Sequence, residues 1–263
     1  MTTTAESMVR VERADGLLTV TLNRPEKMNS VGAAMAGELR ALFESVAGDA
    51  DVGCVLVTGA GKAFCAGRDL SEARPDEDAY GIITTVFNPM LQALHDCPKP
   101  TIAAVNGAAM GVGLGLAMAC DLVIAADNAR FSSPFANLGV ALDSGGHYFL
   151  TRAVGLPRAM EMIYTADVIR GRQAEAWGLV NRSVPGLKLL EWSTQLGKRI
   201  AAGPTTAFTE QKALARRALS MSLPEVFDAE ARLQARLVRM PEYAEGLAAF
   251  AGKRRPNFRA LRG

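Results

Sequence analysis

VNGAAMGVGLGLAMACD (105–121) is the stretch that decides how this chain folds. It starts in an apolar strand, passes through a turn and continues as a helix of small residues. A second stretch, VLVTGAGKAFCAGRDL (55–70), also runs from a buried strand into a glycine-rich loop. Neither fits a phosphate-binding loop, because G-x-G-x-x-G starting at Gly111 requires glycine where Leu116 stands, and the Walker pattern is absent.

The residues of these two loops support two interpretations. A helix that begins near Gly111 presents backbone N–H groups without partners and the positive end of its dipole. If the turn at 64–69 faces that helix, two N–H groups converge on one oxygen and form an oxyanion hole. Alternatively, the glycines serve only tight turns and close helix packing. The residues alone leave both interpretations open.

The flanking sequence predicts an α/β protein built from repeated β-β-α or β-α-β units. Apolar runs and alternation predict strands over 9–13, 17–23, 54–59, 101–107 and 121–126. Helical spacing of apolar residues predicts helices over 32–47, 79–96 and 111–120. Asp15-Gly16 predicts the turn that joins the first two strands.

The pattern changes after about residue 185, where long helical segments begin. Prolines at 204, 224 and 241 each suit the first turn of a helix. We therefore predict a core over 1–190 and a C-terminal helical subdomain over 191–263. Apolar residues occur on more than one face of these helices, which predicts packing against a neighbouring subunit.

Composition narrows the possible partners. The 263 residues carry a net charge of +2, and no apolar run reaches about 18 residues, so we expect neither nucleic acid nor membrane as a partner. The N-terminus lacks a secretory pattern, which predicts a cytoplasmic protein. The cysteines form no C-x-x-C pair and the two histidines lie far apart, so we expect reduced thiols and no metal site. These cysteines are Cys54, Cys65, Cys97 and Cys120.

Several motifs in a fixed order resemble the crotonase (enoyl-CoA hydratase/isomerase) family over essentially the whole chain. They are TLNRPEKMNS (21–30), GAGKAFCAGRDL (59–70), KPTIAAVNGAAMGVG (99–113), CDLVIAADNARFSSPFANLGV (120–140), EAWGLVNRSV (175–184) and YAEGLAAFAGKRRPNF (243–258). The resemblance implies a ClpP-like β-β-α superhelix with a C-terminal helical part that forms homotrimers, often paired into homohexamers. It also implies an acyl-CoA thioester as substrate, with coenzyme A as part of that substrate and no separate cofactor.

The resemblance also assigns roles to individual residues. The oxyanion hole falls on the backbone N–H groups of Arg68 and Val112. Coenzyme A and substrate contacts fall on Lys27, Ala66, Gly67, Asp69, Leu70, Gly111, Phe135, Phe250 and Lys253, the last two from the tail of the same or an adjacent subunit. Without the resemblance, the sequence favours Lys27 and Lys253 as solvated surface charges, and Asp69 could instead cap the start of a helix at 70–73.

Two glutamates that hydratases of this family use are missing here, because their positions hold Gly115 and Phe135. Adding water to a double bond needs one group to activate the water and one to protonate carbon, so ordinary hydration is not expected. Asp143 stands where some subfamilies have a catalytic aspartate, including dienoyl-CoA isomerases, 1,2-epoxyphenylacetyl-CoA isomerases and 4-chlorobenzoyl-CoA dehalogenases. The other interpretation of Asp143 is a helix N-cap before Gly145-Gly146.

The chain looks most similar to the 1,2-epoxyphenylacetyl-CoA isomerases. The tryptophan and histidine that assist the aspartate in the dehalogenases are replaced here by Phe135 and Asn88, which argues against dehalogenation. We therefore predict an isomerase that shifts a double bond or isomerises a ring epoxide through an enolate, with Asp143 as proton carrier in apolar surroundings that raise its pKa. The alternatives are an atypical hydratase, lyase, hydrolase or dehalogenase of the family. A further alternative is a homologue that binds acyl-CoA or RNA without catalysis.

Overall fold

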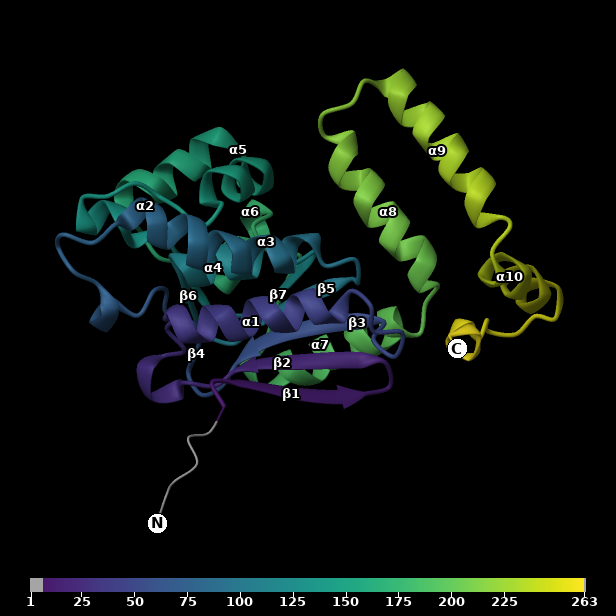
Figure 1. Cartoon of the computed structure of the whole chain (residues 1–263), viewed down its shortest axis with the longest axis horizontal. Coiled ribbons are helices and arrows are strands. Elements are labelled where there is room, and N and C mark those ends of the chain that lie inside the picture. The colour runs from purple at the N-terminus through teal and green to yellow at the C-terminus, as the bar shows by residue number, and fades with distance from the viewer. Residues whose placement is uncertain (1–6, 263) are drawn as a thin grey trace, which may run out of the picture.

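The computed structural model describes residues 7–262, in which ten strands form two sheets (Figure 1). The larger sheet has the order β1 (Val9–Ala14), β2 (Leu17–Leu22), β3 (Cys54–Gly59), β5 (Thr101–Val105), β7 (Leu122–Ala126), β10 (Arg182–Val184). Its strands are parallel except for the β1–β2 hairpin, whose predicted turn at Asp15-Gly16 is present and has positive φ at both residues. The smaller sheet has the order β4 (Ala63–Cys65), β6 (Ala108–Met110), β8 (Arg130–Ser132), β9 (Ile169–Arg170).

Each repeated unit places one strand in each sheet. The pairs are β3 and β4, β5 and β6, and β7 and β8, the first member lying in the larger sheet and the second in the smaller one. The amides of a buried asparagine, Asn29, and a partly buried one, Asn106, fix the corners between them. Asn106 Nδ2 donates to Gly59 O at 2.9 Å, and Asn29 Nδ2 donates to Ala63 O at 2.8 Å. Because these amides satisfy backbone oxygens that the sheets leave unpaired, the short strands hold a fixed angle to the long ones.

Helices cover both faces of the larger sheet. The helices are α1 (Ala33–Val46), α2 (Ala79–Ile82), α3 (Asn88–Asp96), α4 (Val112–Met118), α5 (Gly146–Thr165), α6 (Gly171–Trp177), α7 (Leu189–Ala201), α8 (Thr205–Ala218), α9 (Leu223–Leu237) and α10 (Pro241–Ala251). Single turns are η1 (Pro25–Lys27), η2 (Leu70–Glu72), η3 (Ile83–Phe87), η4 (Pro134–Leu138), η5 (Gly186–Lys188) and η6 (Phe258–Leu261). Helix α1 buries Met35, Leu39 and Phe43, as its spacing predicts.

The predicted helix over 79–96 is interrupted by a π-helical turn at η3. Pro89 follows this turn as the second residue of α3. Proline has no backbone N–H, so the regular bond from residue 89 back to residue 85 cannot form. The π-helical turn before Pro89 has wider spacing and pairs the other backbone N–H and C=O groups of this segment. Turns of this kind are frequent at functional sites. The last residue of η3, Phe87, is buried beside the predicted site.

The C-terminal helices lean away from the sheets. Helix α7 packs against β2, β3, β5 and β7, whereas α8 and α9 form a hairpin that stands off the core in Figure 1. The predicted boundary at residue 190 therefore falls inside α7, which the structure places with the core. Helix α8 is bound to the core partly through Asp121, which pairs with Lys212 at 2.7 Å and with Arg216 at 2.8 Å. Side chains of α8 also donate to the backbone carbonyls of His95, Pro98 and Lys99. Within residues 7–262, no helix is long and apolar enough to cross a membrane.

Candidate active site

The ends of two neighbouring short strands bring the glycine-rich loops together. Strands β4 and β6 are parallel, with Cys65 opposite Ala109. Arg68 and Val112 each follow this pair by three residues, so the register places them at the same edge of the smaller sheet. The backbones approach closely there: a Cβ added to Gly67 would lie 3.0 Å from Met110 O.

The backbone N–H groups of Arg68 and Val112 are both free. Among residues 7–262, neither donates to a backbone or side-chain acceptor. Gly111, with φ 51°, turns the chain so that Val112 becomes the first residue of α4. Val112 itself keeps a negative φ, so its side chain causes no backbone strain. Two unpaired donors at one sheet edge are what an oxyanion hole requires. The hole itself stays a prediction.

Gly115, where the resemblance places the first glutamate of a hydratase, has no room for a side chain. A Cβ added to Gly115 would lie 2.5 Å from Ser144 O and 2.7 Å from Ser144 Cβ. The turn that carries Asp143 therefore packs directly onto α4 where larger residues would need space. Ser144 has φ 55° and is buried, so this turn has a definite conformation. A side chain at residue 115 is therefore incompatible with the present position of the 143–145 turn.

The position of the second glutamate is occupied by an aromatic ring. Phe135 lies in η4, and its ring edge is 3.6 Å from where a Cβ on Gly111 would be. Phe135 is partly buried against the core and so flanks the start of α4. This ring contributes apolar surface beside the free N–H of Val112 and no group that transfers a proton.

Asp143 does not cap the following helix. The N-cap of α5 is Gly145, and no side chain bonds to the first turn. Among the described residues, the Asp143 carboxylate accepts a single side-chain hydrogen bond, from Ser144 Oγ at 2.6 Å. Burial raises the pKa of Asp143, while the Ser144 hydroxyl and the charge of Arg68 act in the opposite direction. A half-buried carboxyl with most of its acceptor capacity unused is available for proton transfer.

The side chain of Arg68 is held in a separate contact. Its guanidinium binds Glu77 with two hydrogen bonds, the second of them Nη2 to Oε2 at 2.6 Å. It also lies 5.9 Å from the centre of the Phe87 ring. The loop that follows η2 is thereby joined to the loop that contains the predicted oxyanion donor.

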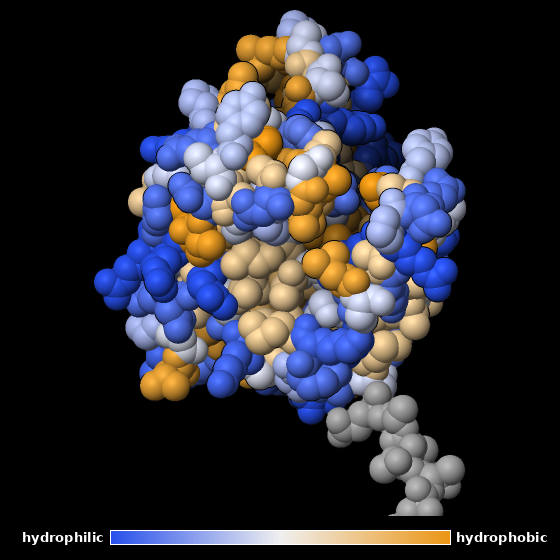
Figure 2. All heavy atoms as spheres, turned by 90° about the vertical axis from the view of Figure 1, so that its left-hand side faces the viewer, coloured by the Kyte–Doolittle hydropathy of each residue, from blue (hydrophilic) through white to orange (hydrophobic). Residues whose placement is uncertain are grey.

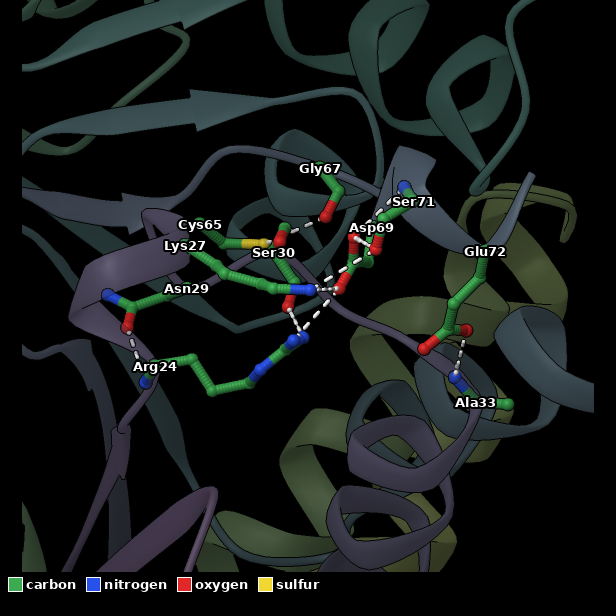
Figure 3. A network of polar contacts seen from close by, with 10 residues as sticks. All are labelled: Arg24, Lys27, Asn29, Ser30, Ala33, Cys65, Gly67, Asp69, Ser71 and Glu72. Atoms are coloured by element: carbon green, nitrogen blue, oxygen red, sulfur yellow. Dashed lines mark hydrogen bonds and ion pairs between the residues drawn. The ribbon is translucent and has the colours of Figure 1, made fainter.

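Lys27 and Asp69 belong to a polar network at the edge of the site (Figure 3). Asp69 Oδ2 contacts Arg24 Nη2 at 2.8 Å and Lys27 Nζ at 3.0 Å. Its carboxylate also accepts from the Ser71 N–H at 3.1 Å and so caps η2, as the alternative interpretation of Asp69 predicts. The Ser71 hydroxyl, followed by Arg24 and Lys27, holds the pKa of Asp69 well below its usual range. Because only 5% of the Asp69 surface is exposed, its carboxylate acts mainly by holding the Lys27 ammonium in place.

Two other residues predicted to contact coenzyme A or substrate lie on the surface of the molecule. Ala66 and Leu70 are exposed, and Leu70 retains 59% of its accessible surface. Figure 2 faces the side that carries α2 and α5 in Figure 1 and shows apolar atoms in its middle, with hydrophilic atoms around them. An apolar surface with a polar border is typical of a site for a ligand that has both characters.

The structure does not bring Phe250 and Lys253 to this site within one chain. Phe250 ends near the tip of α10 and is 85% exposed, and Lys253 follows it with φ 50°. In Figure 1, α10 lies at the opposite end of the molecule from α2 and β4. A contact of these residues with the same ligand requires the tail of a neighbouring subunit, which is one of the two predicted arrangements.

Sequence reasoning missed several partners of the site residues. Ser144 could have been found from its position next to Asp143. Glu77 and Arg24 could not, because their pairing with Arg68 and Asp69 depends on how the loops fold back. The four cysteines are free and buried, and burial raises the pKa of the Cys65 thiol to about 12. Cys65 is therefore no nucleophile at neutral pH. Within residues 7–262, no cluster of three or more His, Cys, Asp or Glu is placed to hold a metal.

The two-sheet β-β-α core, with unpaired N–H groups where β4 and β6 end, defines a crotonase-type protein. The sequence profile of the enoyl-CoA hydratase/isomerase family matches residues 12–260. The chain is 39% identical to a probable enoyl-CoA hydratase of Rhodobacter capsulatus, over 95% of this chain and 97% of the relative. It is 36% identical to the 1,2-epoxyphenylacetyl-CoA isomerase of Escherichia coli, over 92% and 95%. The crystal structure of enoyl-CoA hydratase from Bacillus anthracis superposes with a TM-score of 0.92 at 31% identity, over 96% and 99%.

This chain belongs to the enoyl-CoA hydratase/isomerase family, and it is an enzyme of that family. The predicted α/β crotonase fold and the predicted family are confirmed, whereas the trimerisation role of the C-terminal helices stays a prediction. The names of its relatives include both hydratases and an isomerase, so membership alone leaves the reaction open.

Proposed function

We propose that this enzyme is an acyl-CoA isomerase that moves a proton between two carbons of a thioester-bound acyl group. The observation that carries the proposal is the contact of Ser144 with Gly115. The turn that packs on Gly115 carries the Asp143 carboxyl, and the family resemblance assigns the two glutamates of a hydratase to the positions of Gly115 and Phe135. One carboxyl remains for the chemistry, and a 1,3-proton shift needs only one.

The proposed reaction uses the two free N–H groups and Asp143 in sequence. The N–H groups of Arg68 and Val112 donate to the thioester oxygen and stabilise the negative charge that develops on it. The Asp143 carboxylate takes a proton from one carbon, and the electrons of the broken C–H bond delocalise into the enolate. The protonated Asp143 then returns the proton two carbons away on the same face. Burial favours this step, because it raises the pKa of Asp143 and makes the protonated form easier to reach.

Ring-epoxide isomerisation is an equivalent use of the same site. The 1,2-epoxyphenylacetyl-CoA isomerase of E. coli is similar over nearly the whole chain, and the apolar ring of Phe135 suits an aromatic or unsaturated acyl group. We include this substrate in the proposal as the second acyl class to be assayed.

The coenzyme part of the substrate is proposed to lie along the edge formed by Ala66, Leu70 and Lys27. The Lys27 ammonium is held by Asp69 and Ser71 and remains half exposed, so it is placed to meet a phosphate. We further propose that chains assemble as homotrimers or homohexamers. Support comes from exposed apolar residues on the C-terminal helices, among them Leu219, Leu223, Phe227 and Leu247.

The test is a panel of acyl-CoA thioesters assayed for isomerisation and for hydration, with the wild type and Asp143→Asn. We expect isomerisation by the wild type and a loss of at least about a hundredfold in kcat for Asp143→Asn, with coenzyme A affinity nearly unchanged. The substitution keeps the size of the side chain and removes its basicity. Near-normal turnover of Asp143→Asn, or hydration faster than isomerisation in the wild type, would contradict the proposal.

A further inference from the structure

A cavity of about 470 Å³ lies between one face of α3 and the start of α5. Its volume is in the range that sites for small molecules have. Helix α3 contributes residues spaced three or four apart, which lie on one face of the helix. The main wall residues are Asn88, Leu91 and His95 from α3, and Ser144, Tyr148 and Phe149 from the turn and helix opposite. Aromatic and aliphatic walls with a few polar groups suit a ligand that is mostly apolar and polar at one point.

Ser144 connects this cavity with the predicted base. It lines the cavity, and its hydroxyl donates to Asp143 Oδ1 at 2.6 Å. Its backbone carbonyl also packs on Gly115 of α4. Gly115 is three residues beyond Val112, whose free N–H belongs to the predicted oxyanion hole, and this is about 5 Å along the helix. One end of the cavity therefore lies beside the groups that would hold and deprotonate the thioester.

The cavity extends from this end along α3. Asn88 comes directly after Phe87, whose ring lies 5.9 Å from the Arg68 guanidinium, so this part of α3 is also close to the site. His95 is seven residues further along the helix, which is a distance of about 10 Å. With carbon–carbon bonds of about 1.5 Å, an extended acyl chain needs roughly eight carbons to cover this distance. An acyl group of medium length that reacts at the near end therefore reaches His95.

The ring of His95 presents one of its nitrogens to the cavity. Among residues 7–262, Nδ1 is buried without a partner, whereas Nε2 is accessible and also has none. The rings of Tyr148 and Phe149 meet the imidazole edge to face, with centroids 6.2 and 5.7 Å away, and hold its orientation. Burial, followed by the charge of Arg216, lowers the pKa of His95, so the ring is neutral at neutral pH. Because a buried N–H without a partner is rarer than a buried acceptor without one, the proton belongs on Nε2, which is then a donor.

We propose that this cavity receives the remote part of the acyl group, and that the Nε2–H of His95 selects chains with a neutral oxygen acceptor, a keto or hydroxyl group, at that depth. This role rests on the proposed function, which places the thioester at Arg68 and Val112. A hydrocarbon chain would cover Nε2 and leave its N–H without water or partner, which costs affinity. A chain that ends in a carboxylate would meet Asp96, which also lines the cavity and repels it.

The first test is the ¹⁵N–¹H spectrum of the imidazole rings in the full-length protein, which reports the tautomer of each ring. The chain has two histidines, and the exposed His147 serves as internal control for His95. The protein is titrated with 7-oxooctanoyl-CoA and with octanoyl-CoA, which differ in one keto group and have no double bond to move. We expect the ligand-free His95 to be neutral with its proton on Nε2. The keto ligand should shift the Nε2–H resonance of His95, and neither ligand should shift His147.

The second test is calorimetric affinity for wild type, His95→Phe and His147→Gln. Phenylalanine keeps an aromatic ring in the cavity wall and removes the donor. We expect His95→Phe to lower the ratio of the octanoyl-CoA Kd to the 7-oxooctanoyl-CoA Kd by at least about tenfold. His147→Gln should leave this ratio unchanged. Octanedioyl-CoA, which ends in a carboxylate, should bind the wild type more weakly than the keto ligand.

An equal ratio in wild type and His95→Phe would overturn the inference, and so would tightest binding of octanedioyl-CoA. An absent shift of His95 with both ligands would overturn it as well, and this result does not depend on the folding of a variant. Both tests measure binding, so they are separate from the reaction. If the ratio changes as expected while Asp143→Asn retains isomerase activity, the role of His95 stands and the proposed reaction fails. Loss of activity in Asp143→Asn with an unchanged ratio gives the reverse.

Discussion

Alanine at position 115 should destabilise the protein and disturb Asp143 at once. The new Cβ would lie 2.5 Å from Ser144 O, and that atom is backbone, so no side-chain rotation relieves the contact. Reaching ordinary van der Waals distance requires a displacement of roughly 1 Å. Overpacking of this kind costs about 1–3 kcal/mol, and the better helix propensity of alanine returns about 0.5–1 kcal/mol. The two ranges leave a net loss of up to about 2.5 kcal/mol, centred near about 1 kcal/mol, and each kcal/mol lost lowers Tm by about 2–4 °C in a chain of this size.

The matched control is Gly37→Ala. Gly37 also lies within a helix, but a Cβ there meets nothing within 4 Å. This variant should gain about 0.5–1 kcal/mol in thermal unfolding and keep its turnover. Gly115→Ala should lose at least about tenfold in kcat, since a shift of Ser144 moves the adjacent carboxyl relative to the substrate. If both variants behave alike in unfolding and in kcat, the packing of the 143–145 turn on α4 is not what positions Asp143.

Two further predictions concern the C-terminal helices. Asp121→Asn should lower the free energy of unfolding by about 1–3 kcal/mol, because Lys212 and Arg216 keep their charges in a largely buried place without the carboxylate. The control is Glu191→Gln, which breaks the exposed ion pair with Lys188. In the same denaturant titration it should change the free energy of unfolding by less than about 0.5 kcal/mol. Equal effects of the two variants would contradict the reasoning. Deleting 243–263 should dissociate the oligomer and weaken coenzyme A binding together, as followed by light scattering and calorimetry. A monomer with undiminished affinity would show that the two are independent.

The sequence predicted the long strands well and the short ones poorly. CVLVTG and TIAAV are apolar runs long enough to be recognised, and they form β3 and β5. The strands of the smaller sheet have two or three residues, so no periodicity can develop in them. Their conformation comes from pairing with one another and from the corners held by Asn29 and Asn106. These contacts join parts of the chain that lie far apart in sequence.

The residues of the candidate site also differ in whether the sequence could predict them. Arg68, Val112 and Asp143 could be predicted as site residues because each belongs to a motif of consecutive residues. The pair of Arg68 with Glu77 was not found, since nothing in the sequence says that the loop after η2 returns to this point. The alternative role of Asp143 as a helix cap was excluded only by the structure, which places Gly145 at that position without a side-chain bond.

Gly115 and the 143–145 turn have to be considered together, and this limits how the reaction could be changed. From the sequence, glycine at 115 indicates only that a glutamate is absent. In the structure, the carbonyl and Cβ of Ser144 occupy the space into which any side chain at 115 would extend. The turn itself depends on positive φ values at Ser144 and Gly145, so it cannot move aside without losing its conformation. A glutamate introduced at 115 would therefore displace Asp143 before it could activate water. A side chain at residue 115 and the turn that carries Asp143 therefore exclude one another, because both need the same volume beside α4.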